Sequence, residues 1–207
     1  MDELTLKKFT LGALGTNAYL IIDEKAKKAF LIDTPDGSEK IKEFIVKEKL
    51  SLDFIILTHG HFDHIAGLDN FDCPVYIHVD DKPCLDDAGL NGSEFFSRPI
   101  TIKKEAKALE DGSSLSFQAS VLNIIHTPGH TPGGICIKLN NWLFSGDTLF
   151  FDSVGRTDLP YGSHDSLIKA IKQKIMVLPP DTVVYPGHGP KTTVGREKES
   201  NQFLQDI

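Results

Sequence analysis

A short segment rich in histidine and aspartate is the clearest chemical feature of the sequence: residues 58–64 read THGHFDH. An apolar run precedes the segment and predicts a buried strand of a layered α/β protein. Side chains at alternate positions of an extended segment point the same way, so His59 and His61 can bind one ion. Asp63 and His64 are better placed to serve a second ion. The segment therefore predicts a pair of metal ions.

Three more residues of metal-binding type each follow a predicted strand and a glycine: His130, Asp147 and His188. The prolines and glycines around them predict rigid turns that can aim a side chain. Nitrogen and oxygen donors without a thiolate suit zinc, and also iron or manganese. The repeated order of strand, glycine and ligand-type residue predicts that these residues complete the site begun by residues 59–64.

The composition is that of an ordinary globular protein, with 40% hydrophobic and 25% charged residues in 207, and we expect one domain over residues 1–207. A net charge of −7 argues against a nucleic-acid partner. No apolar stretch resembles a secretory signal or a membrane span. Three scattered cysteines fit a reducing cytoplasm better than a disulfide framework. Nothing in the sequence specifies an oligomeric state.

Short apolar segments predict two groups of strands. The predicted strands cover residues 4–9, 18–22, 29–32, 53–57 and 75–78 in the first group, and 115–117, 121–125, 134–139, 142–145 and 182–185 in the second. Helices are expected over 38–49, from about 63, over 80–87, 164–176 and 195–206, with a loop over 88–104. Strands in two groups, each followed by helices, predict two sheets packed face to face with helices outside. In the loop, Phe95 and Phe96 either line a pocket mouth or plug the core.

The full pattern resembles a known family over essentially the whole chain. The HxHxDH run, followed by a Gly-His, a Gly-Asp and a second Gly-His, is similar to the metallo-β-lactamase superfamily. Residues 127–134 (TPGHTPGG), 146–150 (GDTLF) and 155–158 (GRTD) resemble its glyoxalase II-like, hydroxyacylglutathione hydrolase-like branch. The resemblance implies an α/β fold, a four-layer αββα sandwich, with a dinuclear metal site in the groove between its sheets.

The resemblance also implies a role for each ligand-type residue. His59, His61 and His130 would hold metal 1, Asp63, His64 and His188 would hold metal 2, and Asp147 would bridge them.

Two further residues fall at family-like positions near the site, Asp33 and Asn17. Each is either a partner that orients a ligand imidazole or a former of a turn, and the orienting role is favoured for Asp33. Arg156 either holds a carboxylate of the substrate or makes a surface ion pair, and Tyr161 could line the pocket. Where glyoxalase II has a Lys-Phe-Tyr cluster and a helical C-terminal domain for glutathione, this sequence has residues 156–158 (RTD) and only nineteen residues after His188. It is thus more similar to the short bacterial type II glyoxalases.

Two divalent cations, zinc first among the candidates, can share one water and lower its pKa from 15.7 toward about 7. The resulting hydroxide, oriented by Asp63, would attack the carbonyl of a small-molecule thioester of the S-lactoylglutathione type. A free thiol has a pKa of about 8.5, so the leaving thiolate requires no strong general acid.

Three other functions stay open. Persulfide dioxygenases also resemble this sequence and would use one iron held by His59, His130 and Asp147. Another ester or lactone could be the substrate, or the chain could be a non-enzymatic metal-binding module. Of the remaining histidines, His126 is expected to be structural, and His78 and His164 are expected to be solvated or capping residues.

Overall fold

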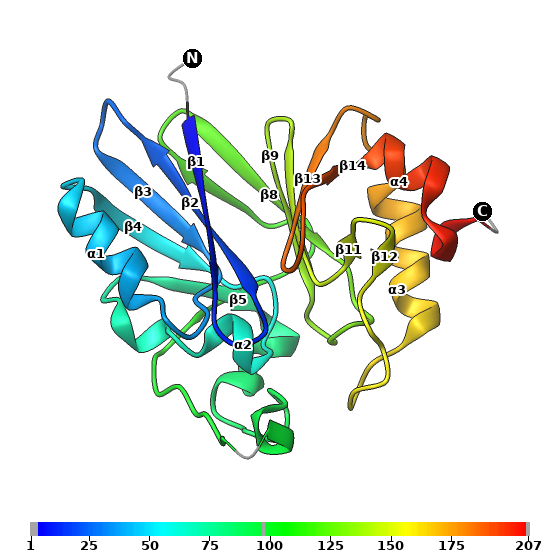
Figure 1. The fold of residues 1–207 in the computed structure, drawn as a ribbon, viewed down its shortest axis with the longest axis horizontal. Helices are drawn as coiled ribbons and strands as arrows, with labels where there is room; N and C mark the ends of the chain where they lie inside the picture. Colours follow the sequence, from blue (N-terminus) through cyan, green and yellow to red (C-terminus); the bar gives the residue numbers. More distant parts are fainter. Residues whose placement is uncertain (1–3, 97, 206–207) are drawn as a thin grey trace.

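The computed structural model describes residues 4–96 and 98–205, in which two six-stranded sheets face each other (Figure 1). Outside the described residues lie residues 1–3 and position 206, the last residue of the predicted terminal helix. The first sheet contains, in spatial order, β1 (Leu4–Leu11), β2 (Thr16–Asp23), β3 (Lys28–Ile32), β4 (Ser51–Ile56), β5 (Val75–His78) and β6 (Lys107–Leu109). The first three strands pair antiparallel, and β3 to β6 pair parallel.

The second sheet contains, in spatial order, β14 (Thr192–Thr193), β13 (Val183–Pro186), β10 (Trp142–Gly146), β9 (Ile135–Leu139), β8 (Ser120–His126) and β7 (Ser114–Phe117). All its neighbours pair antiparallel except β10 and β13. A two-stranded ladder of β11 (Leu149–Phe150) and β12 (Ser153–Val154) lies beside it.

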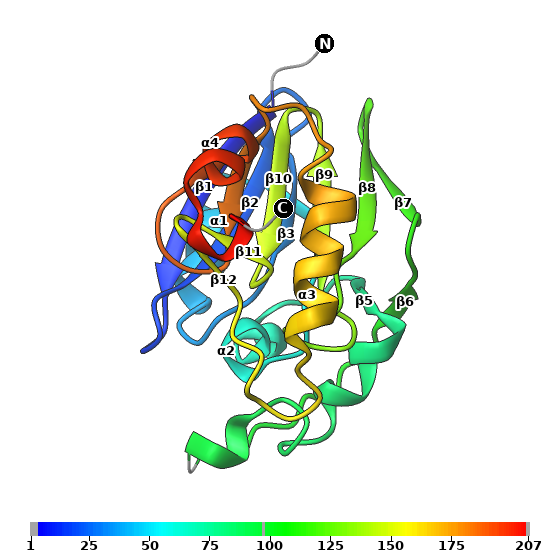
Figure 2. The ribbon, with the colours of Figure 1, turned by 90° about the vertical axis from the view of Figure 1, so that its right-hand side faces the viewer.

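Helices cover the outer face of each sheet. On the first sheet these are α1 (Glu39–Lys47) and the short α2 (Phe62–Ile65), and on the second they are α3 (His164–Ala170) and α4 (Val194–Ser200). A π-helical turn, residues 171–175, continues α3, which Figure 2 shows lying along the second sheet. The order of layers is helix, sheet, sheet, helix, so the αββα expectation and its single-domain form are confirmed.

Strand β2 shows why the sequence favours this arrangement. All eight of its residues are buried, because successive side chains point to opposite faces and both faces are covered. Leu20 and its alternate neighbours pack under α1, whereas Tyr19 and Ile21 enter the layer between the sheets. A continuous apolar run therefore forms a central strand instead of an amphipathic one.

Most of the expected strands and helices are found with small shifts at their ends, and two helices differ from the expectation. The helix predicted over 195–206 ends at Ser200, and a separate 3-10 turn, Gln202–Leu204, follows after Asn201. The predicted helix over 80–87 is a 3-10 segment, Val79–Leu85. Its interior Pro83 has no N–H for an i→i−4 hydrogen bond, which disfavours an α-helix there. The loop over 88–104 contains a further 3-10 turn, Ser93–Phe96. The very short strands β6, β11, β12 and β14 were not foreseen, because two or three residues carry no periodicity.

No helix among the described residues has the length and apolar character required to cross a bilayer.

The layer between the sheets predicts the stability effect of a core truncation. Phe30 is fully buried and its ring lies 5.2 Å from Phe54 and 4.8 Å from Phe117, measured between centroids. Replacing Phe30 by Ala leaves a cavity between the sheets, so we expect Phe30→Ala to lower the free energy of unfolding by about 3–5 kcal/mol in urea. Val46→Ala, at a helix position that is 69% exposed, is the control and should change it by under about 0.5 kcal/mol. Equal losses for the two variants would contradict this packing.

Candidate metal centre

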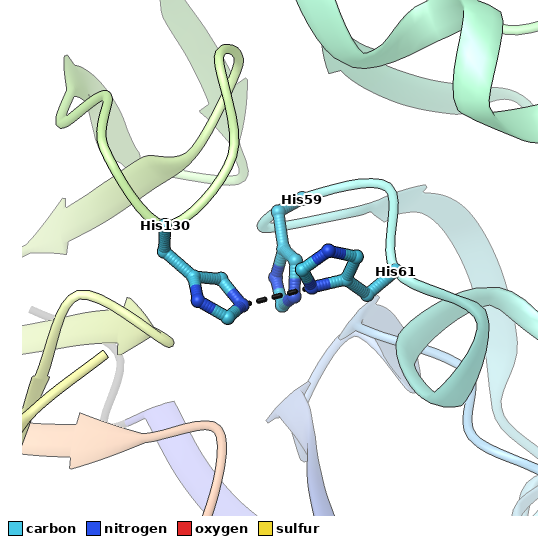
Figure 3. Close-up of side chains that lie close together, drawn as sticks. All are labelled: His59, His61 and His130. Atoms are coloured by element: carbon cyan, nitrogen blue, oxygen red, sulfur yellow. Dashed lines mark hydrogen bonds between the residues drawn. The ribbon is translucent and has the colours of Figure 1, made fainter. Parts of the chain in front are cut away.

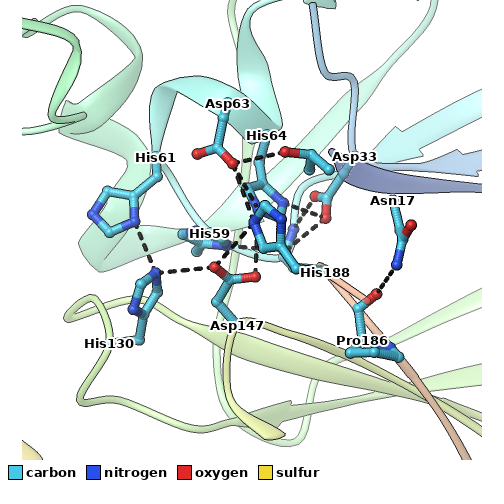
Figure 4. Close-up of polar contacts among 12 residues, drawn as sticks. Asn17, Asp33, His59, His61, Asp63, His64, His130, Asp147, Pro186 and His188 are labelled. Carbon is cyan, nitrogen blue, oxygen red and sulfur yellow. Dashed lines mark hydrogen bonds and ion pairs between the residues drawn. The ribbon is translucent and has the colours of Figure 1, made fainter. Parts of the chain in front are cut away.

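Four strands of the two sheets deliver the ligand-type residues to one place. Residues 59–64 follow β4, His130 follows β8, Asp147 follows β10 directly, and His188 follows β13. Figure 4 shows these side chains pointing toward one another across the space between the sheets. The structure brings together all seven residues that the sequence analysis selected. They form three overlapping groups: His59, His61 and His130; His59, His64 and Asp147; and Asp63, His64 and His188.

The first group consists of imidazoles alone (Figure 3). His59 and His61 are both at most 7% exposed, and their ring centroids lie 4.9 Å apart. His61 Nδ1 lies 2.8 Å from His130 Nε2. Three imidazoles that converge in this way form the donor set of a zinc or iron site.

The other two groups add carboxylates. In the third group, His188 Nε2 lies 3.2 Å from Asp63 Oδ2 and 3.4 Å from His64 Nε2. Asp147, of the second group, lies between the first and the third, with Oδ1 3.4 Å from His64 Nε2 and Oδ2 3.5 Å from His130 Nε2. A carboxylate at that position can contact ions on both sides.

Hydrogen bonds on the outer side fix which nitrogen faces the centre in four of the five rings. His130 Nδ1 donates to the carbonyl of Arg156 at 2.8 Å, and His188 Nδ1 donates to the carbonyl of Leu14 at 3.2 Å. His64 Nδ1 donates to Asp33 Oδ2 at 2.8 Å. Because these oxygens only accept, each Nδ1 carries a proton and each Nε2 is the nitrogen that faces the centre. Oriented imidazoles of this kind are typical of metal ligands.

His59 follows the same rule through Thr58. The Thr58 hydroxyl donates to Asp33 Oδ2 at 2.8 Å, so it accepts from His59 Nδ1, which lies 3.1 Å away. The opposite nitrogen, His59 Nε2, is buried and has no hydrogen-bond partner among the described residues, and neither has Asp147 Oδ1. A buried polar atom without a partner costs about 1–3 kcal/mol. Two such atoms that face one centre fit divalent cations, as does the donor set of imidazoles and carboxylates.

The charged groups of the site shift one another's pKa values. Burial opposes protonation of His64, but Asp63, Asp33 and Asp147 outweigh burial and raise the His64 pKa well above its usual value. Burial likewise opposes a charge on Asp147, yet His64 and His188 hold the Asp147 pKa well below its usual value.

The remaining rings differ in charge. Burial lowers the pKa of His59 far below its usual value, and burial with His130 lowers the pKa of His61 to about 3. Burial disfavours the cation of His188, but hydrogen bonds to Asp147 and Asp63 raise its pKa to about 9. Metal ions bind the neutral imidazole, so cations entering the site would displace the second proton, the one on Nε2, from His64 and from His188.

Asp33 orients the site from beneath, as the sequence analysis favoured. Its carboxylate is 1% exposed and accepts from His64 Nδ1, from the Thr58 hydroxyl and from the Thr58 backbone amide. It therefore fixes the His64 ring and the start of the 58–64 segment together. Asp33 has φ 60°, a left-handed conformation that Asp adopts more readily than most residues.

Asn17 supports the turn that carries His188. Its side-chain amide donates to the carbonyls of Pro186 and Gly189, both at 3.0 Å, and its backbone amide donates to the carbonyl of Gly187. A Cβ at Gly187 would overlap Asp147 Oδ1, so only glycine permits this close approach. Asn17 thus positions a ligand turn without touching the ligand ring.

Two residues that contribute to the site were missed from sequence. The Thr16 hydroxyl donates to Asp63 Oδ2 at 2.7 Å. Asp81 is fully buried and accepts from the Gly60 amide, the Thr131 hydroxyl and the Gly133 amide, at 2.6 to 2.8 Å. It joins the loop of His59 and His61 to the turn of His130. Asp81 follows the predicted strand 75–78, and that placement after a strand was the available signal.

A cavity of about 400 Å³ opens over the centre. Apolar side chains make up much of its wall: Leu14, Phe62, Phe96, Phe150, Val154 and Leu159. Phe96 is 53% exposed and packs on Phe62 with ring centroids 4.8 Å apart, so the pocket-mouth alternative holds for Phe96.

Two polar candidates lie at the edge of this cavity or beyond it. Arg156 lines it, but the guanidinium makes two hydrogen bonds to Asp158, at 2.7 and 2.8 Å, so the expected surface ion pair is present. Tyr161 is 69% exposed and is not among the lining residues, so we do not assign it a substrate contact.

The fold and the site belong to a known class. Residues 11–188 match the family model of the metallo-beta-lactamase superfamily, and the chain belongs to that superfamily. A Bacillus subtilis protein described as "Probable metallo-hydrolase YqgX" is 36% identical over 205 residues, with 96% of each chain covered. The hydroxyacylglutathione hydrolase GloC of Haemophilus influenzae is 32% identical over 209 residues, covering 97% of this chain and 98% of GloC.

Solved structures agree with this assignment. The crystal structure of the BLEG-1 B3 metallo-beta-lactamase has a TM-score of 0.92 at 40% identity, covering 97% of this chain and all of that one. The crystal structure of TTHA1623 in a di-iron-bound form has a TM-score of 0.84 at 37% identity, covering 96% of this chain and all of that one. The candidate site and the family together imply divalent metal ions.

The contacts of Asp81 predict an effect on metal affinity. An amide at this position brings its own N–H groups toward three donors, so Asp81→Asn leaves a buried donor without an acceptor. We expect Zn²⁺ affinity, measured by chelator competition, to fall at least about tenfold, as for other residues that orient ligands. The exposed Asp69→Asn is the matched control and should bind as the unmodified chain does. Unchanged affinity in Asp81→Asn would show that the two ligand loops do not depend on this link.

Proposed function

We propose that this chain is a metal-dependent thioester hydrolase with substrates of the S-lactoylglutathione type. The observation that carries the proposal is the convergence of five imidazoles and two carboxylates, four of the rings being held so that Nε2 faces the centre. Similarity to GloC along nearly the full length supports the thioester class.

In this proposal, His59, His61 and His130 would hold one cation, Asp63, His64 and His188 would hold the other, and Asp147 would contact both. Zinc is the first candidate, with iron or manganese as alternatives, and the di-iron form of TTHA1623 supports considering iron. When bound, two such cations acidify a shared water to a pKa of about 7 and polarise a carbonyl oxygen.

The protein residues would then orient the reactants. Asp63 accepts a hydrogen bond from Thr16 and lies beside His188, which fixes the direction of its second oxygen. We assign that oxygen the role of orienting the attacking water and receiving its proton. The leaving thiolate is stable near neutral pH, since a thiol has a pKa of about 8.5, so no further acid is required.

The cavity bears on the substrate. Its apolar wall favours the carbon skeleton of an acyl or thiol group, because burying apolar surface stabilises a complex by about 25 cal/mol per Å². The guanidinium of Arg156 is the candidate partner for a substrate carboxylate, and that contact requires it to exchange its bond with Asp158. We therefore propose a small-molecule thioester that is partly apolar. The three cysteines are unpaired, which supports the cytoplasm as the proposed location.

The position of Asp63 predicts the outcome of a direct assay. The zinc-loaded chain should hydrolyse S-lactoylglutathione, and Asp63→Asn should lower kcat/KM by about 10²–10⁴-fold because the amide cannot accept a proton. The exposed Asp69→Asn should match the unmodified chain. Metal analysis of Asp63→Asn separates loss of the cation from loss of the base. Absence of turnover by the loaded chain, or equal turnover by Asp63→Asn, would reject the proposal.

A β-lactam is the second candidate substrate, favoured by the similarity to the BLEG-1 B3 metallo-beta-lactamase. Both substrates carry an activated acyl carbonyl, so one site could serve both. The persulfide dioxygenase alternative needs only two imidazoles and one carboxylate on a single iron, fewer donors than converge here.

A three-way assay separates these candidates. We expect thioester hydrolysis by the zinc-loaded chain to exceed both cleavage of a chromogenic cephalosporin and oxygen uptake by the iron-loaded chain with glutathione persulfide. A cephalosporin rate above the thioester rate would make the β-lactam the preferred substrate class. Oxygen uptake as the dominant activity, with one iron per chain, would assign the dioxygenase reaction instead.

A further inference from the structure

A second group of possible metal ligands lies at the same edge of the sheets, outside the seven residues of the metal centre. His78 ends β5 of the first sheet and His126 ends β8 of the second, so the two rings meet across the interface between the sheets. The rings stack with centroids 4.0 Å apart and planes 14° apart. Asp80 completes the group, and one ligand atom from each residue lies within 4.8 Å of the others.

Hydrogen bonds fix the protonation of these rings much as they do in the metal centre. His126 Nε2 donates to the carbonyl of Pro132 at 2.8 Å, so Nδ1 of His126 keeps its lone pair. His78 Nδ1 accepts from the backbone amide of Asp80 at a long 3.3 Å, so it also carries a lone pair. Asp80 Oδ2 lies 3.6 Å from this nitrogen. Two imidazole lone pairs and one carboxylate are thus available together.

We propose that His78, Asp80 and His126 form a separate binding site for one transition-metal cation such as Zn²⁺. Two imidazoles and a carboxylate, completed by water, make a common zinc donor set. Asp80 is about half exposed, so a cation can enter from solvent. Because stacked rings hold their lone pairs in parallel planes, binding requires the His78 ring to turn out of the stack until its nitrogen points at the cation, while His126 keeps its hydrogen bond to Pro132.

The surroundings favour a cation at this group. Burial and the neighbouring His126 lower the pKa of His78, which keeps its ring neutral and available as a ligand. The carboxylates of Asp80, Asp111 and Glu110 act in the opposite direction on the pKa of His78, and they place negative charge near the group. The nearby ammonium of Lys174 is paired with Asp111 at 2.7 Å, so its charge is largely compensated.

A cation held here would link two segments that position ligands of the metal centre. The carbonyl that fixes His126 belongs to Pro132, two residues after the ligand His130. Asp80 precedes Asp81, which binds the Gly60 amide and Thr131. One cation between His126 and Asp80 therefore ties the turn of His130 to the segment that anchors the 58–64 loop. We assign the site a structural role for this reason.

The test counts Zn²⁺ per chain at equilibrium. The unmodified chain is dialysed against buffered micromolar free Zn²⁺, and the bound metal is measured by atomic emission. We expect the His78→Ala/His126→Ala variant to bind one equivalent less than the unmodified chain. Asp80→Ala, which leaves the stacked rings in place, should lose the same equivalent. His164→Ala, an exposed histidine at the start of α3, is the matched control and should lose none.

Nuclear magnetic resonance gives a second readout in the unmodified chain. Labelled imidazole signals of His78 and His126 should shift together at the last equivalent of Zn²⁺, as the ring stack opens. Equal zinc content in the unmodified chain and both variants would overturn the proposal, as would histidine signals that do not respond. Because the comparison is a difference of one equivalent, it stands whether the metal centre itself binds one ion or two.

Discussion

The metal centre depends on the way the protein holds the far side of each imidazole. A buried ring can adopt either tautomer, and only one of them presents a lone pair to a central cation. In this chain the choice is made for four rings by oxygens: the carbonyls of Leu14 and Arg156 and the carboxylate of Asp33 come from distant segments, and the hydroxyl of Thr58 comes from the residue next to His59. The cluster of nitrogens at the centre follows from these four contacts.

The sheets make those contacts possible because they bring chain segments with large sequence separations to one edge. The layer between the sheets is packed with aromatic and branched side chains, including Phe30, Phe117 and Phe144, all fully buried. Close packing of this kind resists small displacements, so the loops at the strand ends start from fixed positions. Asp81 then links the loop from the first sheet to the turn from the second. Precision at the site is therefore a property of the whole sandwich.

Three different features lie along the same edge of the sheets. At its centre, buried atoms without a hydrogen-bond partner among the described residues, such as His59 Nε2, fit divalent cations. Above them, an apolar cavity provides room for a substrate skeleton. To one side, the stacked rings of His78 and His126 join the end of β5 in the first sheet to the end of β8 in the second.

Much of the fold could be read from sequence, because buried strands and amphipathic helices leave a periodic pattern in the chain. The strand β2 and the helix beginning at His164 are examples, and their ends were placed to within a few residues. Short edge strands such as β14 were not readable, since two residues have no period and pair only when the sheet exists. The 3-10 form of residues 79–85 was missed although Pro83 gave a local reason for it.

For the site, the sequence by itself determined the ligand types and their places after strands, because a ligand loop needs a rigid strand to aim it. Only the tertiary structure decided which nitrogen of each ring faces inward, and it alone revealed the roles of Thr16 and Asp81. It also decided that the guanidinium of Arg156 donates to Asp158 while the carbonyl of Arg156 accepts from His130. Most of these choices depend on hydrogen bonds between residues far apart in the chain, such as Thr16 with Asp63 and Gly60 with Asp81, and no local pattern encodes such partners.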